Sequence, residues 1–404
     1  MSAQTLLAVE LAGYIAIARV SVKWFRGAWR ELTFAALNIS ALYFFFFRGV
    51  PPDRRYASTF LAYLALVIFQ YGALRLFVGK SGSLPWIAFF TPILGLVFVR
   101  YLPPAVFGGE RYLYGAFFIG ISYLAFRSSY LVLEVRNGTA PMPGLCRYLG
   151  FCFFLPTMAV GPINPYSNHC RGFSADPPAL PKGRALLRIL VGIVKFKFLG
   201  SLCAQLGYAN LLFDDHYHHW IDLFAAIVFY YLFLYCNFSG FCDMAIGTAG
   251  LIGIPVAENF DSPFAARNVR DFWNRWHITL SHYMRDVVFA PLSKFFVRLM
   301  GPANANHAVA LTITVVFLLV GVWHGVGWNF AAFGLIHAVG VVGNHYYTIA
   351  LKKRLGRDGF KRYHENRWIQ AAAVSVTFCY VAMSLCFFAN TMSELKQILS
   401  FSRF

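Results

Sequence analysis

The sequence contains few charged residues, which argues against an ordinary water-soluble protein. Charged residues make up 13% of the 404 positions, hydrophobic residues make up 58%, and the mean hydropathy is +0.56. Soluble domains average about 25% charged residues. Acidic residues are the scarcest, with 17 Asp and Glu against 35 Lys and Arg, and the formal net charge is +18. We interpret this excess as basic loops that hold the cytoplasmic face of a membrane protein, and we expect no nucleic-acid binding.

Two further absences limit the architecture. None of the eight cysteines forms a CxxC pair, so the sequence predicts neither a disulfide framework nor a zinc site. No polar stretch is long enough to fold as a separate soluble domain, so we predict one integral membrane domain over residues 1–404. No Lys or Arg precedes Arg19, so the first apolar run lacks the basic start of a signal peptide. We interpret it as a retained span with its N-terminus outside the cytoplasm.

Apolar runs of about 20 residues, each long enough to cross a hydrocarbon core, recur along the chain. They predict an all-helical polytopic membrane protein with about 10–12 spans. The clear candidates are residues 31–47, 57–78, 84–102, 113–133, 186–212, 219–238, 307–323, 327–350 and 369–390, and the weaker ones are 4–20, 148–161 and 241–257.

Three polar segments interrupt these runs. Residues 162–185 carry Gly, Pro and Asp with little periodicity, which predicts a loop. Residues 258–306 are too polar to span and too aromatic for a solvated linker, so we expect short helices or a re-entrant segment there. Residues 351–367 are dense in Lys and Arg, which predicts a cytoplasmic loop.

His324 is the first candidate for chemistry, because it lies at the end of an otherwise apolar run. Ionisable residues at membrane depth are costly and usually functional. Gly321, Gly325 and Gly327 would let other backbone approach the imidazole closely. A neutral histidine in a dry pocket is suited to accept a proton from a hydroxyl nucleophile. The alternative is a histidine that only bonds across helices.

His277 is the second candidate, within the string Trp-Asn-Arg-Trp-His. If this string is helical, Trp273, Trp276, His277 and Leu280 share one face. Such a face suits either a site or an aromatic belt at the membrane interface, and the spacing alone does not choose between them.

Two charged or polar pairs carry weaker signals. Arg285 and Asp286 are adjacent and would not face each other on an α-helix, so we expect each to pair with another charge. Ser239 and Asp243 lie at i and i+4. Ser239 could be read as a nucleophile, but we favour local hydrogen bonding in a helix softened by glycine.

The segment 214–220, Asp-Asp-His-Tyr-His-His-Trp, resembles a metal cluster in composition. Its three histidines do not share one helical face, and the run lies between two predicted spans. We favour a solvated loop and predict no bound metal.

Several strings together resemble the membrane-bound O-acyltransferase family, and in particular its bacterial branch for alginate O-acetylation and teichoic acid D-alanylation. They are Leu-Ile-Gly-Ile-Pro-Val-Ala-Glu-Asn-Phe, Asp-Phe-Trp-Asn-Arg-Trp-His-Ile-Thr-Leu-Ser and Trp-His-Gly, at 251–260, 271–281 and 323–325. Asn237–Gly250 and the Gly-Pro-Ile at 161–163 add to the likeness. The clear resemblance covers about 236–340, where the catalytic motifs are expected.

The resemblance implies a ring of helices around a funnel and a tunnel, and transfer of an acyl group from a thioester to a hydroxyl. The family's near-invariant histidine falls on His324 as general base, and its motif histidine falls on His277. The expected lining or supporting residues are Trp323, Asn274, Arg275, Trp276, Ser281, Arg285, Asp286, Ser239 and Asp243.

The resemblance also suggests partners. The donor would be an acyl-CoA or an acyl carrier protein with a phosphopantetheine arm, presented on the cytoplasmic side of a bacterial inner membrane. The acceptor would be a polysaccharide or polyol polymer outside, reached directly or through a periplasmic or extracellular acyl-transfer partner. No bound cofactor is expected. A transporter or flippase for an envelope precursor is the alternative, although its polar groups would be expected in both halves of the chain.

Overall fold

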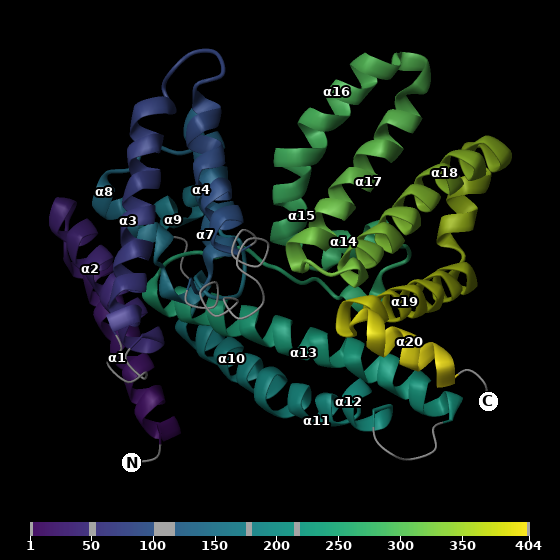
Figure 1. Cartoon of the computed structure of the whole chain (residues 1–404), viewed down its shortest axis with the longest axis horizontal. Helices are drawn as coiled ribbons and strands as arrows, with labels where there is room; N and C mark the ends of the chain where they lie inside the picture. The colour runs from purple at the N-terminus through teal and green to yellow at the C-terminus, as the bar shows by residue number, and fades with distance from the viewer. Residues whose placement is uncertain (1–2, 48–53, 101–117, 175–179, 214–218, 402–404) are drawn as a thin grey trace. The chain divides into compact units, whose positions relative to one another are not determined.

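The computed structural model describes residues 3–47, 54–100, 118–174, 180–213 and 219–401, and the regular elements among these residues are all helices. The helices of the first half are α1 (Ala3–Trp24), α2 (Gly27–Phe46), α3 (Arg54–Phe77), α4 (Pro85–Arg100), α7 (Ile121–Arg136), α8 (Leu145–Cys152), the 3-10 turn η2 (Leu155–Thr157), α9 (Tyr166–Gly172), α10 (Lys182–Ile193), the π-helix η3 (Val194–Leu199), α11 (Gly200–Gln205) and α12 (Tyr208–Leu211). The helices of the second half are α13 (Trp220–Ile252), η4 (Pro263–Ala265), α14 (Val269–Arg275), α15 (Ile278–Met284), the π-helix η5 (Arg285–Phe289), α16 (Ala290–Met300), η6 (Pro302–Asn304), α17 (Ala305–His324), α18 (Trp328–Glu365), α19 (Arg367–Ala389) and α20 (Met392–Phe401). Figure 1 labels most of them.

The chain divides into two compact units. The first unit is Met1–Ile193 with Phe241–Glu258, and the second is Val194–Gly240 with Asn259–Phe404. The long helix α13 contributes residues to both units. Both predicted histidine candidates, His277 and His324, belong to the second unit.

Several helices meet the length and composition of membrane spans, so the chain is a multi-pass membrane protein. Four pass both tests within the described residues: Thr59–Phe77, Trp220–Ile252, Pro302–His324 and Arg367–Ala389. Pro85–Arg100 is a shorter apolar helix. The all-helical prediction is therefore confirmed.

Some predicted boundaries were wrong. The candidates 219–238 and 241–257 are one 33-residue helix, α13, because the Gly240 between the two apolar runs disfavours a helix by only about 1 kcal/mol and does not end it. The weak candidate 148–161 holds only α8 and η2, which are too short to cross a bilayer. The candidate 186–212 passes through the π-helix η3 and is interrupted before α12.

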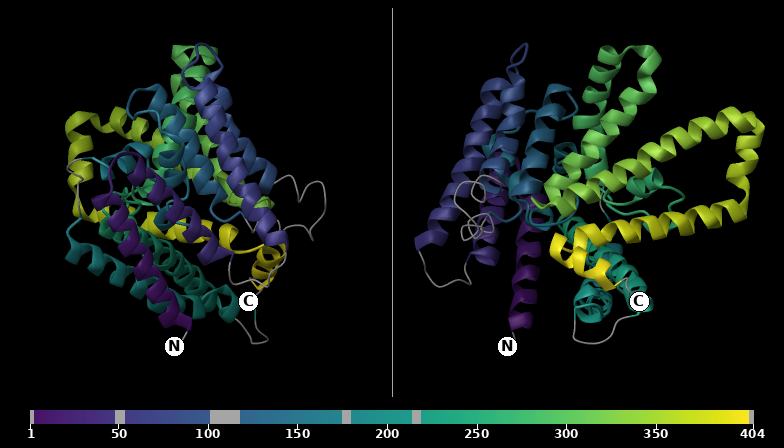
Figure 2. Two further views of the ribbon diagram at one scale, coloured as in Figure 1. Left: turned by 90° about the vertical axis from the view of Figure 1, so that its left-hand side faces the viewer. Right: turned by 45° about the vertical axis from the view of Figure 1, so that its right-hand side comes forward.

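The basic segment 351–367 was also misread as a loop. Helix α18 continues through it to Glu365 and changes direction at Gly356, whose φ of 63° breaks the helical geometry. Lys and Arg are good helix formers, so their density marks a solvated surface without ending the helix. The right-hand view of Figure 2 shows α18 and α19 as a long hairpin.

In the first unit, buried charged groups hold the segment 145–172 against α7. Arg127 of α7 is 1% exposed and donates to the carbonyls of Phe151, at 3.3 Å, and Cys152, at 2.8 Å. Glu134, also on α7, accepts from the backbone N–H groups of Tyr166, at 2.7 Å, and Ser167, at 3.0 Å. A carboxylate at the start of α9 satisfies helix-terminal donors that would otherwise be buried unpaired.

In the second unit, two glycines bring α17 and α18 into backbone contact. A Cβ on Gly321 would lie 2.3 Å from the carbonyl oxygen of Phe330, and one on Gly334 would lie 2.4 Å from that of Phe317. Helices in membranes pack closely where small residues face each other. The last turn of α17, which carries Trp323 and His324, is therefore held tightly against α18. Figure 1 shows α17 beside α16 and next to the start of α18.

The segment 258–306 consists of short helices, as predicted. Asn268 caps α14 by accepting from the backbone N–H of Asp271 at 2.8 Å, and the Asp271 carboxylate accepts from the backbone N–H of Arg267 at 3.0 Å. Reciprocal bonds of this kind fix a helix start. Because α14 is only seven residues long, its end delivers the chain directly to His277.

Candidate active site

His277 occupies a strained turn between two short helices. Its φ of 47° and ψ of 50° lie in the left-handed region, which a residue with a Cβ seldom adopts. Trp273, Trp276 and His277 would share one face only in a continuous helix, and that condition is not met, since α14 ends at Arg275. Strain of this kind persists only where the surroundings hold it, and it clusters at functional sites.

The strand-like stretch around Asn259 holds this turn. Phe260 and Trp276 form an isolated antiparallel bridge, and the N–H of Ile278 donates to the carbonyl of Asn259 at 3.1 Å. The N–H of Asp261 donates to the carbonyl of Arg275 at 3.0 Å. Backbone hydrogen bonds on both sides of His277 therefore fix its position.

The side chain of Asn259 determines which tautomer His277 adopts. The backbone N–H of Thr279 can only donate, and it lies 3.1 Å from the side-chain atom of Asn259, so that atom is the oxygen Oδ1. His277 Nδ1 lies 3.2 Å from the same oxygen and must therefore carry the hydrogen. The other nitrogen, Nε2, then presents a lone pair.

That lone pair is buried and accepts no hydrogen bond from the described residues. His277 is 4% exposed, and its Nε2 has no protein partner among them. Burial, and then the nearby His324, lower the pKa of His277 to about 3. The imidazole is therefore neutral at physiological pH and offers an acceptor inside the protein.

The rings of both predicted histidines pack against Trp323. The centroid of the Trp323 ring lies 6.3 Å from that of His277 and 4.5 Å from that of His324. His277 also packs edge-on against Phe238 at 4.8 Å, and His324 packs edge-on against Phe388 at 4.9 Å. The structure thus brings His277, Trp323 and His324 together from α17 and the short-helix segment.

A third histidine, His337, supports this cluster, and sequence reasoning missed it. The indole N–H of Trp273 donates to His337 Nδ1 at 3.1 Å, so Nε2 carries the hydrogen and donates to Ser384 Oγ at 2.9 Å. The Ser384 hydroxyl then donates to the carbonyl of Val381 at 2.7 Å. This chain joins α14, α18 and α19 and uses both ring nitrogens, so His337 is a structural histidine.

Asn259 was also missed as a site residue. It is fully buried, and its amide oxygen receives the N–H and the hydroxyl of Thr279 as well as His277. Asn259 belongs to the motif 251–260, but spacing in sequence does not indicate that it turns back onto a histidine 18 residues later.

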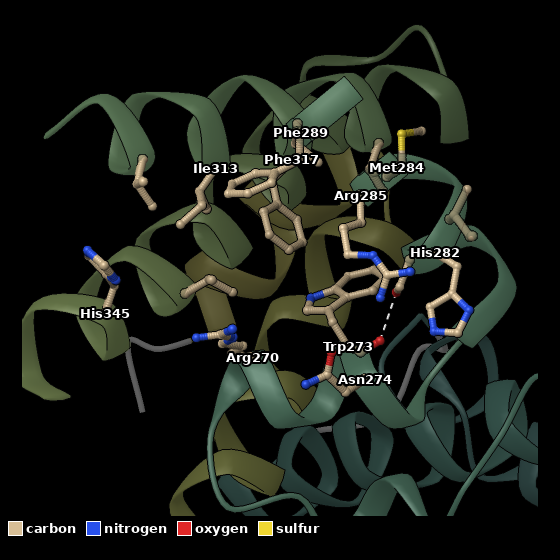
Figure 3. Close-up of a pocket in the computed structure, with 16 residues that line it drawn as sticks. Arg270, Trp273, Asn274, His282, Met284, Arg285, Phe289, Ile313, Phe317 and His345 are labelled. Carbon is tan, nitrogen blue, oxygen red and sulfur yellow. Dashed lines mark hydrogen bonds between the residues drawn. The ribbon is translucent and has the colours of Figure 1, made fainter. Parts of the chain in front are cut away.

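A separate cavity of about 350 Å³ lies beside Trp273 within the second unit. Figure 3 shows Asn274 and Arg285 at this cavity, with Phe317 and Ile313 on its apolar side. The Ser281 hydroxyl, also at the cavity, donates to the carbonyl of Trp273 at 2.7 Å. Neither His277 nor His324 is among its lining residues, so the predicted residues Asn274, Ser281 and Arg285 are grouped apart from the histidine cluster.

Several predicted supporting residues have structural partners. Arg285 donates to its neighbour Asp286 at 2.9 Å, a pair that the sequence did not predict; both residues lie at the start of the π-helix η5. Arg275 pairs with Asp271 at 2.9 Å, one turn away on α14. The Trp276 indole is 7% exposed and packs against aromatic rings that include Phe260, at 5.0 Å.

The predicted local hydrogen bond of Ser239 on α13 is not formed, and Asp243 pairs with a residue of another helix. Asp243 forms an ion pair with Arg188 at 2.9 Å within the first unit, and Arg188 also binds Glu258. The Ser239 hydroxyl is buried and finds no hydrogen-bond partner among the described residues, so the expected local hydrogen bond is not made.

The described residues contain no group of three or more His, Cys, Asp and Glu side chains that could hold a metal. In the segment 214–220, His216 and His218 lie outside the described residues. The prediction for that segment therefore stays a prediction.

The sequence model of the membrane-bound O-acyltransferase family matches residues 20–363, which is most of the chain. The chain belongs to the membrane-bound O-acyltransferase family. It is therefore an O-acyltransferase, and the resemblance extends well beyond the motifs at 236–340 into the N-terminal half.

Similar proteins are named as transferases that act on teichoic acid or alginate. The chain is 30% identical to the teichoic acid D-alanyltransferase of Streptococcus thermophilus over 84% of its own length and 85% of the relative's. It is 31% identical to the teichoic acid D-alanyltransferase of Bacillus subtilis over 68% of its length and 69% of the relative's. It is 28% identical to the probable alginate O-acetylase AlgI of Azotobacter vinelandii over 54% of its length and 42% of the relative's.

Proposed function

We propose that this O-acyltransferase moves a D-alanyl group from a thioester on the phosphopantetheine arm of a cytoplasmic carrier protein to a hydroxyl of an envelope polymer outside a bacterial cytoplasmic membrane. The observation that carries the proposal is the match to a D-alanyltransferase over 84% of this chain, together with the histidine cluster around Trp323. The likeness to the alginate O-acetylase covers less than half of that relative, so acetyl is the second donor to test.

The chemistry requires one base and one aligned pair of reactants. The acceptor oxygen attacks the thioester carbonyl carbon and its proton passes to His324. The C–S bond then breaks, and the thiolate leaves and takes up the proton, so the products are an ester and a free thiol. General-base help of this kind contributes about 10²–10⁴ in rate, and alignment in a dry site contributes further. His324 suits the base role better than His277 because His324 is only partly buried. Burial disfavours the protonated imidazole, so a partly buried ring accepts a proton more readily than a fully buried one.

The tautomer of His277 favours one of its possible roles. Its Nε2 is an acceptor, so it cannot donate a hydrogen bond to a developing oxyanion. It can accept from the hydroxyl of the acceptor or from an amide of the donor arm. We therefore assign His277 to positioning a substrate, with Asn259 holding the ring.

The experiment uses purified protein in nanodiscs with no membrane gradient. The donors are a D-alanyl carrier protein and acetyl-CoA, and the acceptors are a polyol phosphate polymer and a uronic acid polysaccharide. We expect ester formation with the D-alanyl carrier and loss of activity in His324→Ala. Transfer only from acetyl-CoA would replace the donor class in this proposal.

A transporter would behave differently under these conditions. It would form no ester without a gradient and would need two compartments to show substrate flux. Failure with every donor and acceptor, alongside flux in sealed vesicles, would overturn the proposed reaction.

A further inference from the structure

A strongly basic cavity lies in the first unit, and none of the residues that line it is assigned to acyl transfer. It has a volume of about 900 Å³, which falls within the range of about 300–1,000 Å³ typical of small-molecule sites. The end of α1, the start of α2, the segments on either side of residues 175–179 and the end of α13 line it. Its cationic residues are Arg19, Lys23, Arg26, Arg30 and Lys182.

No carboxylate is among the described residues that line this cavity. The nearest acid in sequence, Glu31, already binds Arg147 at 2.6 Å. Five like charges around one hollow repel each other, so an anion placed there would be stabilised by all of them. The arrangement therefore selects for negative charge.

Arg30 adds an unsatisfied donor at this cavity. Its guanidinium lies 5.1 Å from the ring centroid of Phe173, and Arg147 lies 5.6 Å from the same ring. The Nε of Arg30 is buried and donates to no described residue. A buried N–H without an acceptor is destabilising, and an anionic oxygen bound there would remove that cost.

The side chains around the turn from α1 to α2 indicate where this cavity meets the bilayer. Trp24 is 75% exposed, Trp29 is 68% exposed and Phe25, at the cavity, is 41% exposed. Exposed tryptophans next to Lys and Arg are typical of the membrane–water interface. The basic residues also suit the leaflet that carries anionic lipid.

We propose that this cavity binds the phosphate headgroup of an anionic phospholipid. The cationic side chains line one cavity instead of covering a flat surface. A cavity of this kind fits a single headgroup better than it fits the surface of a folded acidic protein. The exposed aromatic side chains would lie among the glycerol and acyl chains of the same lipid. The proposal does not depend on the identity of the acyl donor or acceptor.

The test is lipid binding by native mass spectrometry of the detergent-purified protein. The probes are dioleoylphosphatidylglycerol and dioleoylphosphatidylcholine, which share a phosphate but differ in net charge. The pocket variant is Lys23→Gln, Arg26→Gln and Lys182→Gln, three exposed cations at the cavity. The matched control is Lys353→Gln, Arg354→Gln and Arg357→Gln, three exposed cations on α18.

We expect phosphatidylglycerol to bind the wild-type protein at least about tenfold more tightly than phosphatidylcholine, as charge selection requires. The pocket variant should lose most of that preference, and the control should keep it within about twofold, since screened distant charges contribute little. Equal losses in both triple variants would overturn the proposal, because they would indicate diffuse attraction to the whole basic face.

Two further arms separate the sources of the anion. Full displacement of the lipid by millimolar inorganic phosphate would show a free-anion site instead of a lipid site. Unchanged lipid binding in the pocket variant, with lost binding of an acidic carrier protein, would assign the cavity to a protein partner. An unchanged melting temperature and elution volume for each variant would show that folding is preserved, and failure of acyl transfer would leave this result unaffected.

Discussion

Two fully buried histidines, one in each unit, differ in a way that separates structure from chemistry. His169 on α9 is 1% exposed, and neither of its ring nitrogens has a hydrogen-bond partner among the described residues. His277 is 4% exposed, has one nitrogen bonded to Asn259 and sits on a strained backbone. In both, burial is the main cause that lowers the pKa to about 3.

The comparison shows that burial and a shifted pKa do not by themselves mark a site. His169 lies in regular helix, and its ring packs among aromatic rings that include Phe173, at 5.1 Å, and Phe151, at 5.4 Å. Aromatic rings therefore surround an imidazole whose two nitrogens have no hydrogen-bond partner among the described residues. In His277 one ring nitrogen is oriented by Asn259 and the other is buried without a hydrogen-bond partner among the described residues, and this asymmetry is our reason for proposing that it meets a substrate.

The largest fall in acyl transfer is expected when His277 is replaced. We predict that His277→Ala lowers acyl transfer by about a hundredfold or more, because it removes the oriented acceptor from the site. The measurement is the rate of ester formation by purified protein at saturating donor. The control is Trp276→Phe, in the aromatic cluster of the same turn. If His277→Ala kept near-normal activity while the Trp276→Phe control folded poorly, the positioning role proposed for His277 would be wrong. His277 would then belong to the aromatic packing of this turn.

Variants at Asn259 test whether the hydrogen bond to Nδ1 of His277 matters for activity. We predict that Asn259→Ala lowers activity about tenfold or more, because the amide oxygen that holds Nδ1–H is lost. Asn259→Asp keeps an acceptor and should recover part of the rate, but its buried negative charge raises the pKa of His277 from about 3. The acid limb of the pH–rate profile should therefore move to higher pH. An unchanged profile in Asn259→Asp, with equal losses in both variants, would contradict the positioning role.

His337 provides an intermediate case, since both of its nitrogens are bonded. We predict that His337→Leu lowers stability, because the Trp273 N–H and the Ser384 hydroxyl lose their shared partner at about 1–3 kcal/mol for each buried group left unpaired. Ser384→Ala, which breaks only one of these bonds, should cost less. Thermal unfolding in detergent measures both changes. Equal melting temperatures for the wild type and His337→Leu would refute this hydrogen-bonded chain.

The smallest effect is expected at His169. We predict that His169→Leu keeps activity within about twofold and leaves stability at pH 7 unchanged or higher, because it removes a buried N–H that has no acceptor. A large loss of transfer at full stability would place His169 in the chemistry and remove the distinction drawn above.

The same variant has a signature in the pH dependence of stability. His169 has a pKa of about 3 when folded and near 6.5 when unfolded, so the unfolded chain binds more protons between these values. Its neutral form favours folding fully above about pH 6.5, and this contribution is lost as the pH falls toward 3. The melting temperature of His169→Leu should therefore fall less than that of the wild type between pH 7 and pH 5. A parallel fall in both would contradict the assignment.

The sequence predicted the fold class, because composition and apolar run length act locally. It also singled out His277 and His324, whose rings both pack against Trp323 in the structure, while their catalytic roles stay predictions. It did not predict how His277 is held, because the chain returns from Asn259 to His277 through backbone bonds that have no period. It did not predict the ion pair between Arg285 and Asp286, because adjacent residues on a helix do not face each other and the pairing depends on how the long arginine side chain folds back. It also divided α13 in two, because a polar residue such as Asn237 marks a chemical interruption of an apolar run but not a break in the helix.

Our central proposal is direct transfer without an acylated protein, with His324 as the general base and His277 positioning a substrate. The most direct measurement is a single-turnover reaction with excess protein over thioester donor, followed by ester yield and intact protein mass. We predict that the wild type forms the ester and that His324→Ala forms none. With donor alone, the mass of the protein should be unmodified. A stable acyl adduct on Ser239 or Ser281, or His324→Ala activity within a few fold of wild type, would contradict it.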